Sequence, residues 1–412
     1  MRKLLPIMIF IATVAFSMDY DVHKNLITVE SRFIKYEFST DGHMENVYHQ
    51  RKLIYSYDSD GFDTPSTPTN YKVWKSGQDV YLQFIYPDYT KTFHFIDGPY
   101  YEFTVKLNKK VEMKLPRVWY PSNDRYEDDL FISFSPKKYV SIVKFSGEME
   151  NPGTVEAESA KVYLGPGKKN LIKGAFPEDY KKIMNLLKDM YGVYDAIFYG
   201  LVWFFDYLYK LTGNFGWAII LFTFVVRLAL YPLYHAQTKS MINMRKIQKD
   251  IEYIRRRYKD PQRQQEELMK LYKEKGVNPM SGCLMMLVQL PIFFMLWGVL
   301  RHFQEEFAYG KGFLIWKDLS VGGFKENIVL VLITVVASFY STLITSQDTR
   351  SAWQGIMMSV IFPFLFISLP SGLFIYYATN TLIQLAITYY IYKKYKIKGL
   401  TIRELLGLSK KA

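Results

Sequence analysis

The chain has 412 residues, of which 49% are hydrophobic and 17% aromatic, and its formal net charge is +13. The single cysteine, Cys283, excludes an intrachain disulfide, and six scattered histidines without ligand spacing or a phosphate-binding loop give no indication of metal, nucleotide or other cofactor chemistry. The mean hydropathy of −0.06 averages a polar, aromatic part with long apolar runs after about residue 195, which predicts a membrane protein carrying a water-soluble domain.

Residues 1–18 begin MRKLLPIMIFIATVAFS, two basic residues followed by an apolar stretch. That stretch fits a signal peptide cleaved near Ser17 and equally fits an uncleaved transmembrane anchor. Both interpretations export the residues that follow.

Residues 19–175 alternate apolar and polar side chains in short runs such as YLQFIYP and KVYLGP, separated by Gly, Pro, Asn and Asp. This pattern predicts an exported antiparallel β-sandwich, in which we find no catalytic set. Residues 176–212 become helical in pattern. Their aromatic segment YDAIFYGLVWFFDYLYKL predicts an amphipathic helix in the outer membrane interface.

Five apolar runs of membrane-spanning length follow, and with the N-terminal segment they predict six transmembrane segments. The fourth run is short and contains Pro363. The runs are Phe215–Tyr234, Cys283–Leu300, Asn327–Ser346, Trp353–Leu369 and Leu373–Tyr392. They place the second transmembrane helix within residues 213–235 and the remaining four within 279–392.

Positive charge predicts the orientation of these spans. Residues 236–278 contain 12 Lys and Arg and the tail 393–412 contains 7, against 4 within 301–325. Cytoplasmic loops carry the excess of Lys and Arg, so the block and the tail are expected in the cytoplasm and residues 19–212 outside. The charge is better explained by an anionic membrane surface than by DNA.

The charged block itself has a helical repeat. Apolar residues from Met244 to Tyr258 recur at intervals of three and four, and Leu268 and Leu271 follow Asp260–Pro261. An antiparallel helical hairpin is predicted. Its basic face is either a solvated surface along the lipid or a docking site for a ribosome.

Arg227 interrupts the apolar run Phe215–Tyr234. An arginine near the bilayer centre costs about 2.5 to 3.5 kcal/mol on insertion scales, so it normally faces water or a partner. Snorkelling to the cytoplasmic surface is the alternative. No Asp or Glu occurs within any predicted span, so we expect a hydrated cavity around Arg227 without a fixed bonded partner.

Polar side chains at helical spacing accompany this arginine. Thr223, Arg227 and Tyr231 share one stripe of their helix, and Tyr377, Asn380 and Gln384 share another. Gln289 lies beside Pro291 in the next span. Ser and Thr in membrane helices are often only packing residues, so Arg227, Gln289, Asn380 and Gln384 are the stronger indicators of a polar groove.

Four segments, TFVVRLALYPL, YKEKGVNPMSGC, LVQLPIFFMLW and SGLFIYYATN, resemble in this order the signature segments of the YidC/Oxa1/Alb3 membrane protein insertases. The resemblance covers about residues 195 to 395. The exported domain is similar to the first periplasmic domain of bacterial members by position and strand pattern alone. The resemblance implies a five-helix core around a hydrophilic groove, with Arg227 inside it, Thr223 one turn earlier and the pair Tyr376 and Tyr377 on the last helix.

The resemblance implies a non-enzymatic insertase of the bacterial inner membrane that takes the acidic ends of nascent membrane proteins into the groove and releases their helices into lipid. Expected partners are these clients, membrane lipids, the ribosome through the hairpin and tail, and the Sec translocon. Two alternatives remain open from the residues. One is an anion channel or transporter with Arg227 as its binding site, although no internal repeat is visible. The other is an exported enzyme on a membrane anchor.

Overall fold

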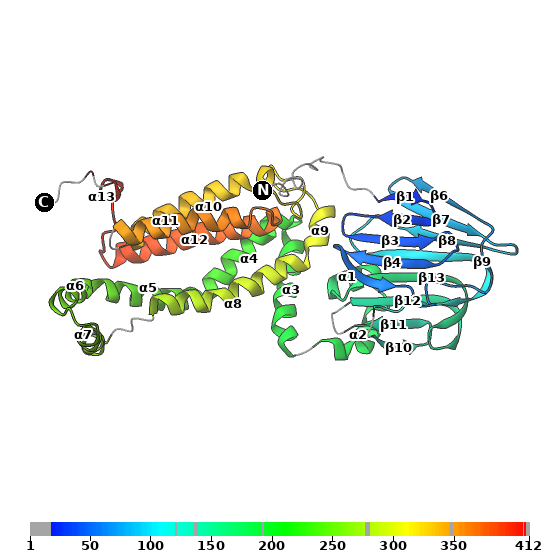
Figure 1. Cartoon of the computed structure of the whole chain (residues 1–412), viewed down its shortest axis with the longest axis horizontal. Coiled ribbons are helices and arrows are strands. Elements are labelled where there is room, and N and C mark those ends of the chain that lie inside the picture. Colours follow the sequence, from blue (N-terminus) through cyan, green and yellow to red (C-terminus); the bar gives the residue numbers. More distant parts are fainter. Residues whose placement is uncertain are drawn as a thin grey trace. The chain divides into compact units, whose positions relative to one another are not determined.

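The computed structural model describes residues 18–119, 122–135, 139–191, 193–276, 281–346, 349–406 and 408. For residues 193, 194, 237, 240, 241, 244, 245 and 281–290 it describes the backbone alone. The predicted N-terminal segment 1–18 therefore lies outside the described residues, apart from Met18. The chain divides between Val193 and Tyr194 into two compact units (Figure 1).

The first unit contains two antiparallel sheets. The smaller sheet is a meander in which each strand pairs with the next along the chain. Its strands are β1 (Asp19–His23), β2 (Leu26–Glu30), β3 (Ile34–Ser39), β4 (Met44–His49) and β5 (Lys52–Ser56).

The larger sheet has eight strands in the order β10-β11-β12-β13-β9-β8-β7-β6. All of its neighbours pair antiparallel, and the long strand β9 pairs with the last strand, β13. The strands are β6 (Asn70–Ser76), β7 (Asp79–Ile85), β8 (Thr90–Phe95), β9 (Glu102–Lys114), β10 (Asn123–Glu127), β11 (Leu130–Phe134), β12 (Tyr139–Asn151) and β13 (Thr154–Pro166).

Aromatic side chains from both sheets form the core between them. The alternation of DVYLQFI in β7 buries Val80, Leu82 and Phe84 completely. Phe38 of β3 packs on Phe93 of β8, with 4.8 Å between ring centroids. Each such ring removes a large apolar area from water when it is buried. The predicted antiparallel β-sandwich is confirmed.

Three short helical segments complete the first unit: α1 (Lys169–Ala175), α2 (Tyr180–Leu186) and the 3-10 helix η1 (Lys188–Met190). Leu171, Ile172 and Ile183 are fully buried. The predicted interfacial region 176–212 is therefore divided in the structure. Its beginning belongs to the first unit and its long helix to the second.

The second unit is helical. Its elements are α3 (Val193–Thr212), α4 (Phe215–Ala229), α5 (Tyr231–Lys246), α6 (Gln248–Arg257), α7 (Pro261–Glu274), α8 (Ser281–His302), α9 (Gln304–Tyr309), α10 (Phe324–Thr345), α11 (Thr349–Leu365), α12 (Ser371–Lys394) and α13 (Ile402–Leu405).

Helix α12 is central to the packing of this unit, because it contacts α4, α8 and α10, and α10 also contacts α11. Figure 1 shows α10, α11 and α12 side by side. Each of the five apolar runs predicted as a span is largely helical. Of the described helices, α10 has both the length and the apolar composition to cross a bilayer, and α4 is a shorter apolar helix.

The predicted span Phe215–Tyr234 is interrupted. Helix α4 ends at Ala229 and α5 starts at Tyr231, while Leu230 between them stays in the right-handed helical region (φ −87°, ψ 0°). Pro232 explains the interruption, because proline lacks the N–H that would donate to the Leu228 carbonyl in a continuous helix. Helix α5 then continues to Lys246, well into the block predicted to be cytoplasmic.

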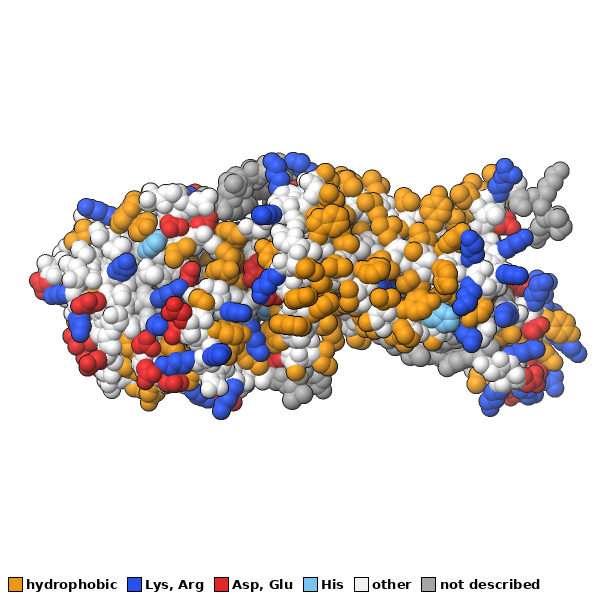
Figure 2. Space-filling view, turned by 180° about the vertical axis from the view of Figure 1, so that it is seen from behind, with side chains coloured by type: hydrophobic (Ala, Val, Ile, Leu, Met, Phe, Trp, Pro, Cys, Tyr) orange, Lys and Arg blue, Asp and Glu red, His pale blue; other side chains and the backbone are white. Residues whose placement is uncertain are grey.

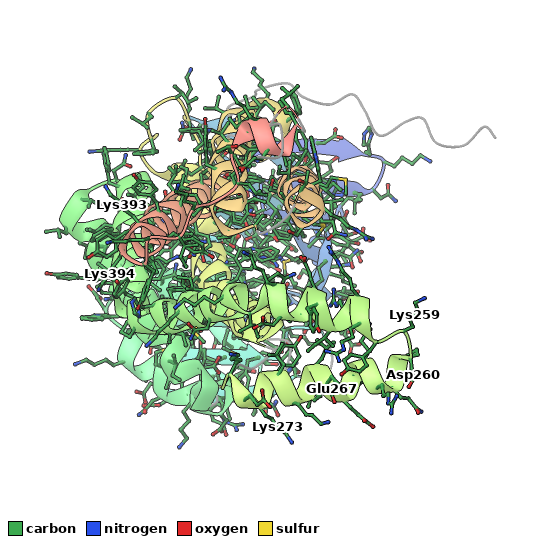
Figure 3. The ribbon with its side chains drawn as sticks, turned by 90° about the vertical axis from the view of Figure 1, so that its left-hand side faces the viewer. Lys259, Asp260, Glu267, Lys273, Lys393 and Lys394 are labelled. Carbon is green, nitrogen blue, oxygen red and sulfur yellow. The ribbon has the colours of Figure 1, made fainter. Side chains whose placement is uncertain are left out.

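The hairpin is formed by α6 and α7. Asp260 caps α7 by accepting from the Arg263 N–H at 3.2 Å, and Pro261 is its first residue. The Gln264 side chain donates to the carbonyls of Arg255 and Tyr258 at 3.1 Å each, which ties the arms together. Figure 3 shows Lys259 and Asp260 at the turn and Glu267 and Lys273 along α7.

Candidate functional site

Helix α4 carries Arg227 on its buried face. Asn214 caps the helix, its side-chain oxygen accepting from the N–H groups of Gly216 (2.9 Å) and Trp217 (3.4 Å). Thr223 and Arg227, four residues apart, point to the same side and are 1% and 5% exposed. The outward side chains Trp217, Phe224 and Leu228 are more than half exposed. The predicted pairing of Thr223 with Arg227 on one face is present.

Two amides of α12 hold the guanidinium. Arg227 Nε donates to Asn380 Oδ1 at 2.6 Å, and Nη1 donates to Gln384 Oε1 at 2.7 Å. The expectation that Arg227 has no bonded partner is therefore wrong. The reason is that amide oxygens four residues apart on a facing helix match two donors of the guanidinium fork without any carboxylate. Because amides are neutral, the positive charge of Arg227 remains uncompensated by these partners.

Gln384 is itself oriented by the next turn of α12. Its Nε2 donates to Thr388 Oγ1 at 3.2 Å, and Thr388 is 2% exposed. An amide whose nitrogen is engaged in this way turns its oxygen toward Arg227. The polar set thus runs from Arg227 through Gln384 to Thr388, one turn further than the sequence predicted.

Tyr234 was missed by the sequence analysis. The Arg227 guanidinium carbon lies 4.3 Å from the centroid of the Tyr234 ring, a cation–π contact, and this tyrosine is 2% exposed. The available signal was its position seven residues after Arg227, which is two helical turns along the same face. Tyr231, which we predicted instead, lies beside His235, with ring centroids 5.9 Å apart, and does not line the Arg227 pocket in the described structure.

Tyr376 and Tyr377 occupy different positions. Tyr376 is 1% exposed, and among the described residues its hydroxyl has no hydrogen-bond partner. Tyr377 packs its ring on Phe362 of α11 at 5.7 Å. The side chain of Gln289 lies outside the description, so its place in the groove stays a prediction.

Two pockets meet at Tyr376. A narrow gap is lined by nine residues, among them Thr223, Arg227, Tyr376 and Asn380, and it has no room for a water molecule, so the hydrated cavity expected around Arg227 is not open in this structure. A larger pocket, with a cavity volume of about 30 Å³, lies between α8, α11 and α12, and its lining is aromatic and aliphatic. Phe293, Trp297, Phe362, Pro363, Phe366, Leu369, Leu373, Phe374 and Tyr377 line it together with Tyr376. A polar site and an apolar site therefore share one wall.

Three threonines of the apolar helices form hydrogen bonds within their own helix. Thr223, Thr334 and Thr381 each donate to the carbonyl four residues earlier, at 2.6 to 2.8 Å. Such bonds satisfy the hydroxyl within its own helix. Among the described residues, no group of three His, Cys, Asp or Glu side chains is arranged to hold a metal.

Aromatic packing fills the other end of α4. Phe205 of α3 lies 4.8 Å from Phe303 and 5.4 Å from Phe222, measured between ring centroids. Phe215, at the start of α4, packs on Phe307 at 4.9 Å. These rings belong to one buried cluster that continues to Phe374 and Tyr376 of α12.

Comparisons with known proteins add the family relationship. A family model described as "60Kd inner membrane protein" matches residues 207–398. The membrane protein insertase YidC of Thermotoga maritima is 53% identical over 413 aligned residues, which cover 94% of this chain and 93% of that protein. The insertase YidC of Endomicrobium trichonymphae is 34% identical over 66% of this chain, and the match spans 53% of that longer protein.

Solved structures agree with these matches. A crystal structure described as an active YidC insertase with the first transmembrane domain resolved superposes with a TM-score of 0.73 and 49% identity, covering 91% of this chain and 95% of that one. The crystal structure of YidC from Thermotoga maritima gives a TM-score of 0.66 and 38% identity, with 90% of this chain covered.

Proposed function

The chain belongs to the YidC family of membrane protein insertases, and we propose that Arg227 and its neighbours form the groove in which it receives the polar end of a client membrane protein. As a member of this family it inserts membrane proteins and is not an enzyme. The proposal for the groove rests on one observation. The buried guanidinium of Arg227 is held by the neutral amides of Asn380 and Gln384, with no carboxylate among its described hydrogen-bond partners.

A client carboxylate is attracted to this charge. Two unit charges about 4 Å apart gain roughly 4 kcal/mol at an effective dielectric constant near 20, several times the value in water. The amide oxygens of Asn380 and Gln384 are the groups that such a carboxylate would replace. They keep the guanidinium solvated by protein until a client arrives.

The apolar pocket supplies the second half of the proposed path. It adjoins the Arg227 pocket at Tyr376 and is bounded by α8, α11 and α12. An apolar client side chain that enters it would be stabilised by about 25 cal/mol for each Å² of apolar area removed from water. Transfer of the client helix into lipid, with the membrane potential adding about 2.3 kcal/mol per charge per 100 mV, then drives insertion without nucleotide hydrolysis.

An anion channel or transporter is the competing proposal for the same arginine. Such a protein needs a path to both sides of the membrane in at least one state. The packed rings of Phe205, Phe215, Phe303 and Phe307 at the other end of α4 favour a groove that is blocked on that side. Solute flux through proteoliposomes would support the channel.

The proposed orientation places the hairpin α6–α7 and the end of α12 in the cytoplasm and the β-sandwich in the periplasm. Its support is the concentration of Lys and Arg, which Figure 2 shows at the hairpin end of the helical unit beyond a broad hydrophobic band. Lys393 and Lys394 lie at the end of α12 on this side (Figure 3). The ribosome, through the hairpin and the tail, and the Sec translocon are proposed partners.

Site-specific crosslinking to ribosome-bound clients tests the groove. Photoreactive residues at Thr223 and Asn380 should capture a client while its translocated end is still short. The matched control is Leu382, which lies on α12 between Asn380 and Gln384 but is 47% exposed. Equal capture from Leu382 at every client length, or none from Thr223 and Asn380, would contradict the proposal.

A further inference from the structure

A tight turn between α9 and α10 exposes two large apolar side chains. Phe313 and Trp316 exchange backbone hydrogen bonds at 2.7 and 2.9 Å, and both side chains are buried. Between them, Leu314 is 78% exposed and Ile315 is 68% exposed. We call residues 311–317 the outer turn.

The backbone of the outer turn is strained at its tip. Leu314 has φ +50°, in the left-handed region that favours Gly, Asn and Asp. A leucine at this position costs conformational energy, and its 78% exposed side chain gains little burial that would offset that cost. Strain at an exposed position is a reason to look for what its side chain contacts.

The outer turn is fixed to the ends of two apolar helices. Phe313 packs against Gly216 of α4, where any side chain larger than hydrogen would clash with its ring. The Asn214 side chain donates to the Gly312 carbonyl at 2.8 Å. Trp316 Nε1 donates to the carbonyl of Glu326, in the first turn of α10, at 2.6 Å. The turn is therefore held at the level where α4 and α10 begin.

That level has the composition of a membrane interface. Trp217 and Phe324, in the first turns of α4 and α10, are 53% and 62% exposed. Trp and other aromatic residues are enriched where helices leave the hydrocarbon. Lys311 and Lys317, the first and last residues of the outer turn, are also exposed.

We propose that the outer turn is a lipid anchor, which inserts Leu314 and Ile315 into the leaflet at the start of α4 and α10 while Lys311 and Lys317 contact lipid phosphates. The apolar tip continues the apolar surface of the adjoining helices. Two side chains are far too small for a stable protein interface, which buries about 800 Å² on each partner. The assignment of that leaflet as the outer one rests on the orientation proposed above, whereas insertion of the turn does not depend on Arg227.

Depth-dependent quenching on the full-length protein tests this anchor. In a Cys283→Ser background, an environment-sensitive fluorophore is attached to Leu314→Cys, and the control carries it at Ser76→Cys, at the exposed end of β6. In phospholipid vesicles, nitroxide lipids labelled near the headgroup should quench position 314 at least threefold more than position 76. Aqueous iodide should instead quench position 76 more than position 314.

Iodide quenching at position 314 equal to that at position 76 would overturn the proposal, and so would protection from both quenchers, which would indicate a protein contact. A second variant removes the apolar side chain at the tip while keeping the backbone fold of the turn. Leu314→Asn suits the left-handed backbone, so the turn should persist, and a label at Ile315→Cys should lose at least half of its lipid quenching in that variant. Unchanged quenching would count against an anchor. Because the readout is not client insertion, either failure leaves the groove proposal standing.

Discussion

Arg227 combines a high desolvation cost with a neutral set of partners. Moving an ion out of water costs several kcal/mol even after relaxation, and the amides of Asn380 and Gln384 with the Tyr234 ring offset part of that cost. A carboxylate partner would offset more but would also cancel the charge. The arrangement therefore keeps a positive charge available inside the helical unit.

The amide fork predicts how the protein responds to replacement of Arg227. Lysine retains the charge but cannot donate in two fixed directions, so Arg227→Lys should reduce insertion of a client with an acidic tail by about three- to tenfold. Arg227→Ala should reduce it further. The protected fraction of client in proteoliposomes measures this, with Arg263→Lys on the exposed hairpin as control. Equal loss in the Lys and Ala variants would instead mean that fork geometry, and not charge, is what matters.

A second buried cation lies in the β-sandwich. Lys91 is fully buried, and its Nζ donates to the carbonyls of Gly42 and Phe62 at 2.7 Å each. Burial lowers the pKa of Lys91 to about 7, and the nearby carboxylate of Asp63 opposes this shift. In the unfolded chain a lysine has a pKa of about 10.4.

This difference predicts a pH dependence for the stability of the first unit. Between about pH 7 and pH 10 the unfolded state binds the Lys91 proton and the folded state does not, so stability should rise with pH, by an amount on the order of 4 kcal/mol across the window. Pulse proteolysis of the β-sandwich in the full-length protein at pH 7 and pH 9 measures it. Lys91→Met should remove most of the increase, and a slope that survives this substitution would assign it to other groups.

Helices α10, α11 and α12 are joined by one buried asparagine. Asn327 is 0% exposed, and its Nδ2 donates to the carbonyls of Ile367 and Leu369, after the end of α11, at 2.7 Å each. Its Oδ1 accepts from Ser371 Oγ, in the first turn of α12, at 2.9 Å. All three contacts fix the start of the helix that carries Asn380 and Gln384.

Removal of this asparagine should destabilise the helical unit as a whole. Asn327→Leu leaves the Leu369 carbonyl without its partner, whereas the Ile367 carbonyl still accepts from the Gly323 N–H at 3.0 Å and the Ser371 hydroxyl still donates to the Val321 carbonyl at 2.9 Å. One unsatisfied buried group costs about 1 to 3 kcal/mol, so we expect a loss of about that size. Ser371→Ala, which removes the hydroxyl bonds to Asn327 Oδ1 and to the Val321 carbonyl, should cost less, because that carbonyl still accepts from the Ser371 N–H at 2.7 Å. Thermal unfolding in detergent compares them, and equal midpoints for wild type and Asn327→Leu would show that the bonds contribute nothing.

At the scale of elements, the periodicity of the sequence predicted the strands and helices but not the contacts between them. The alternating pattern gave the β-sandwich, and the apolar runs gave α8, α10, α11 and α12 within a few residues, because burial of an apolar face is written locally in the sequence. The bonds of Arg227 could not be predicted. They join residues more than 150 positions apart and depend on how α4 faces α12. Pro232 was a local signal for the break after α4 that the length of the apolar run obscured.

Helix α3 shows the same limit. Its aromatic pattern correctly indicated a helix. Apolar residues occur on all sides of that helix, however, so the sequence did not show which face is buried. Val202, Phe205 and Leu208 are buried in the helical core, whereas Trp203, Tyr207 and Leu211 are more than half exposed. On this exposed face Trp203 and Tyr207 stack on each other, with 6.1 Å between ring centroids, and its position in the membrane interface stays a prediction.

At the scale of the whole molecule, the division at Val193 predicts which part can be removed. The polar set around Arg227 lies entirely in the second unit, so deletion of the first unit should leave most insertion activity. The deletion should cover residues 19–190. A cut at residue 170 would leave Leu171 and Ile172 of α1 without the core in which they are buried. A well-expressed deletion that fails to insert clients would give the β-sandwich a direct role.

The most direct test of the account exchanges charge on both sides of the proposed contact. One single-span client is made with a neutral tail and with an Asp in that tail, and each is inserted by wild-type protein and by Arg227→Gln, which keeps a polar side chain without the charge. The account predicts that the Asp favours insertion by wild type over Arg227→Gln by about tenfold or more, as expected for one charge-assisted contact of about 1.5 to 3 kcal/mol, and that the neutral tail shows a much smaller difference. An equal effect of Arg227→Gln on both clients would contradict it, because the arginine would then serve the fold and not the client.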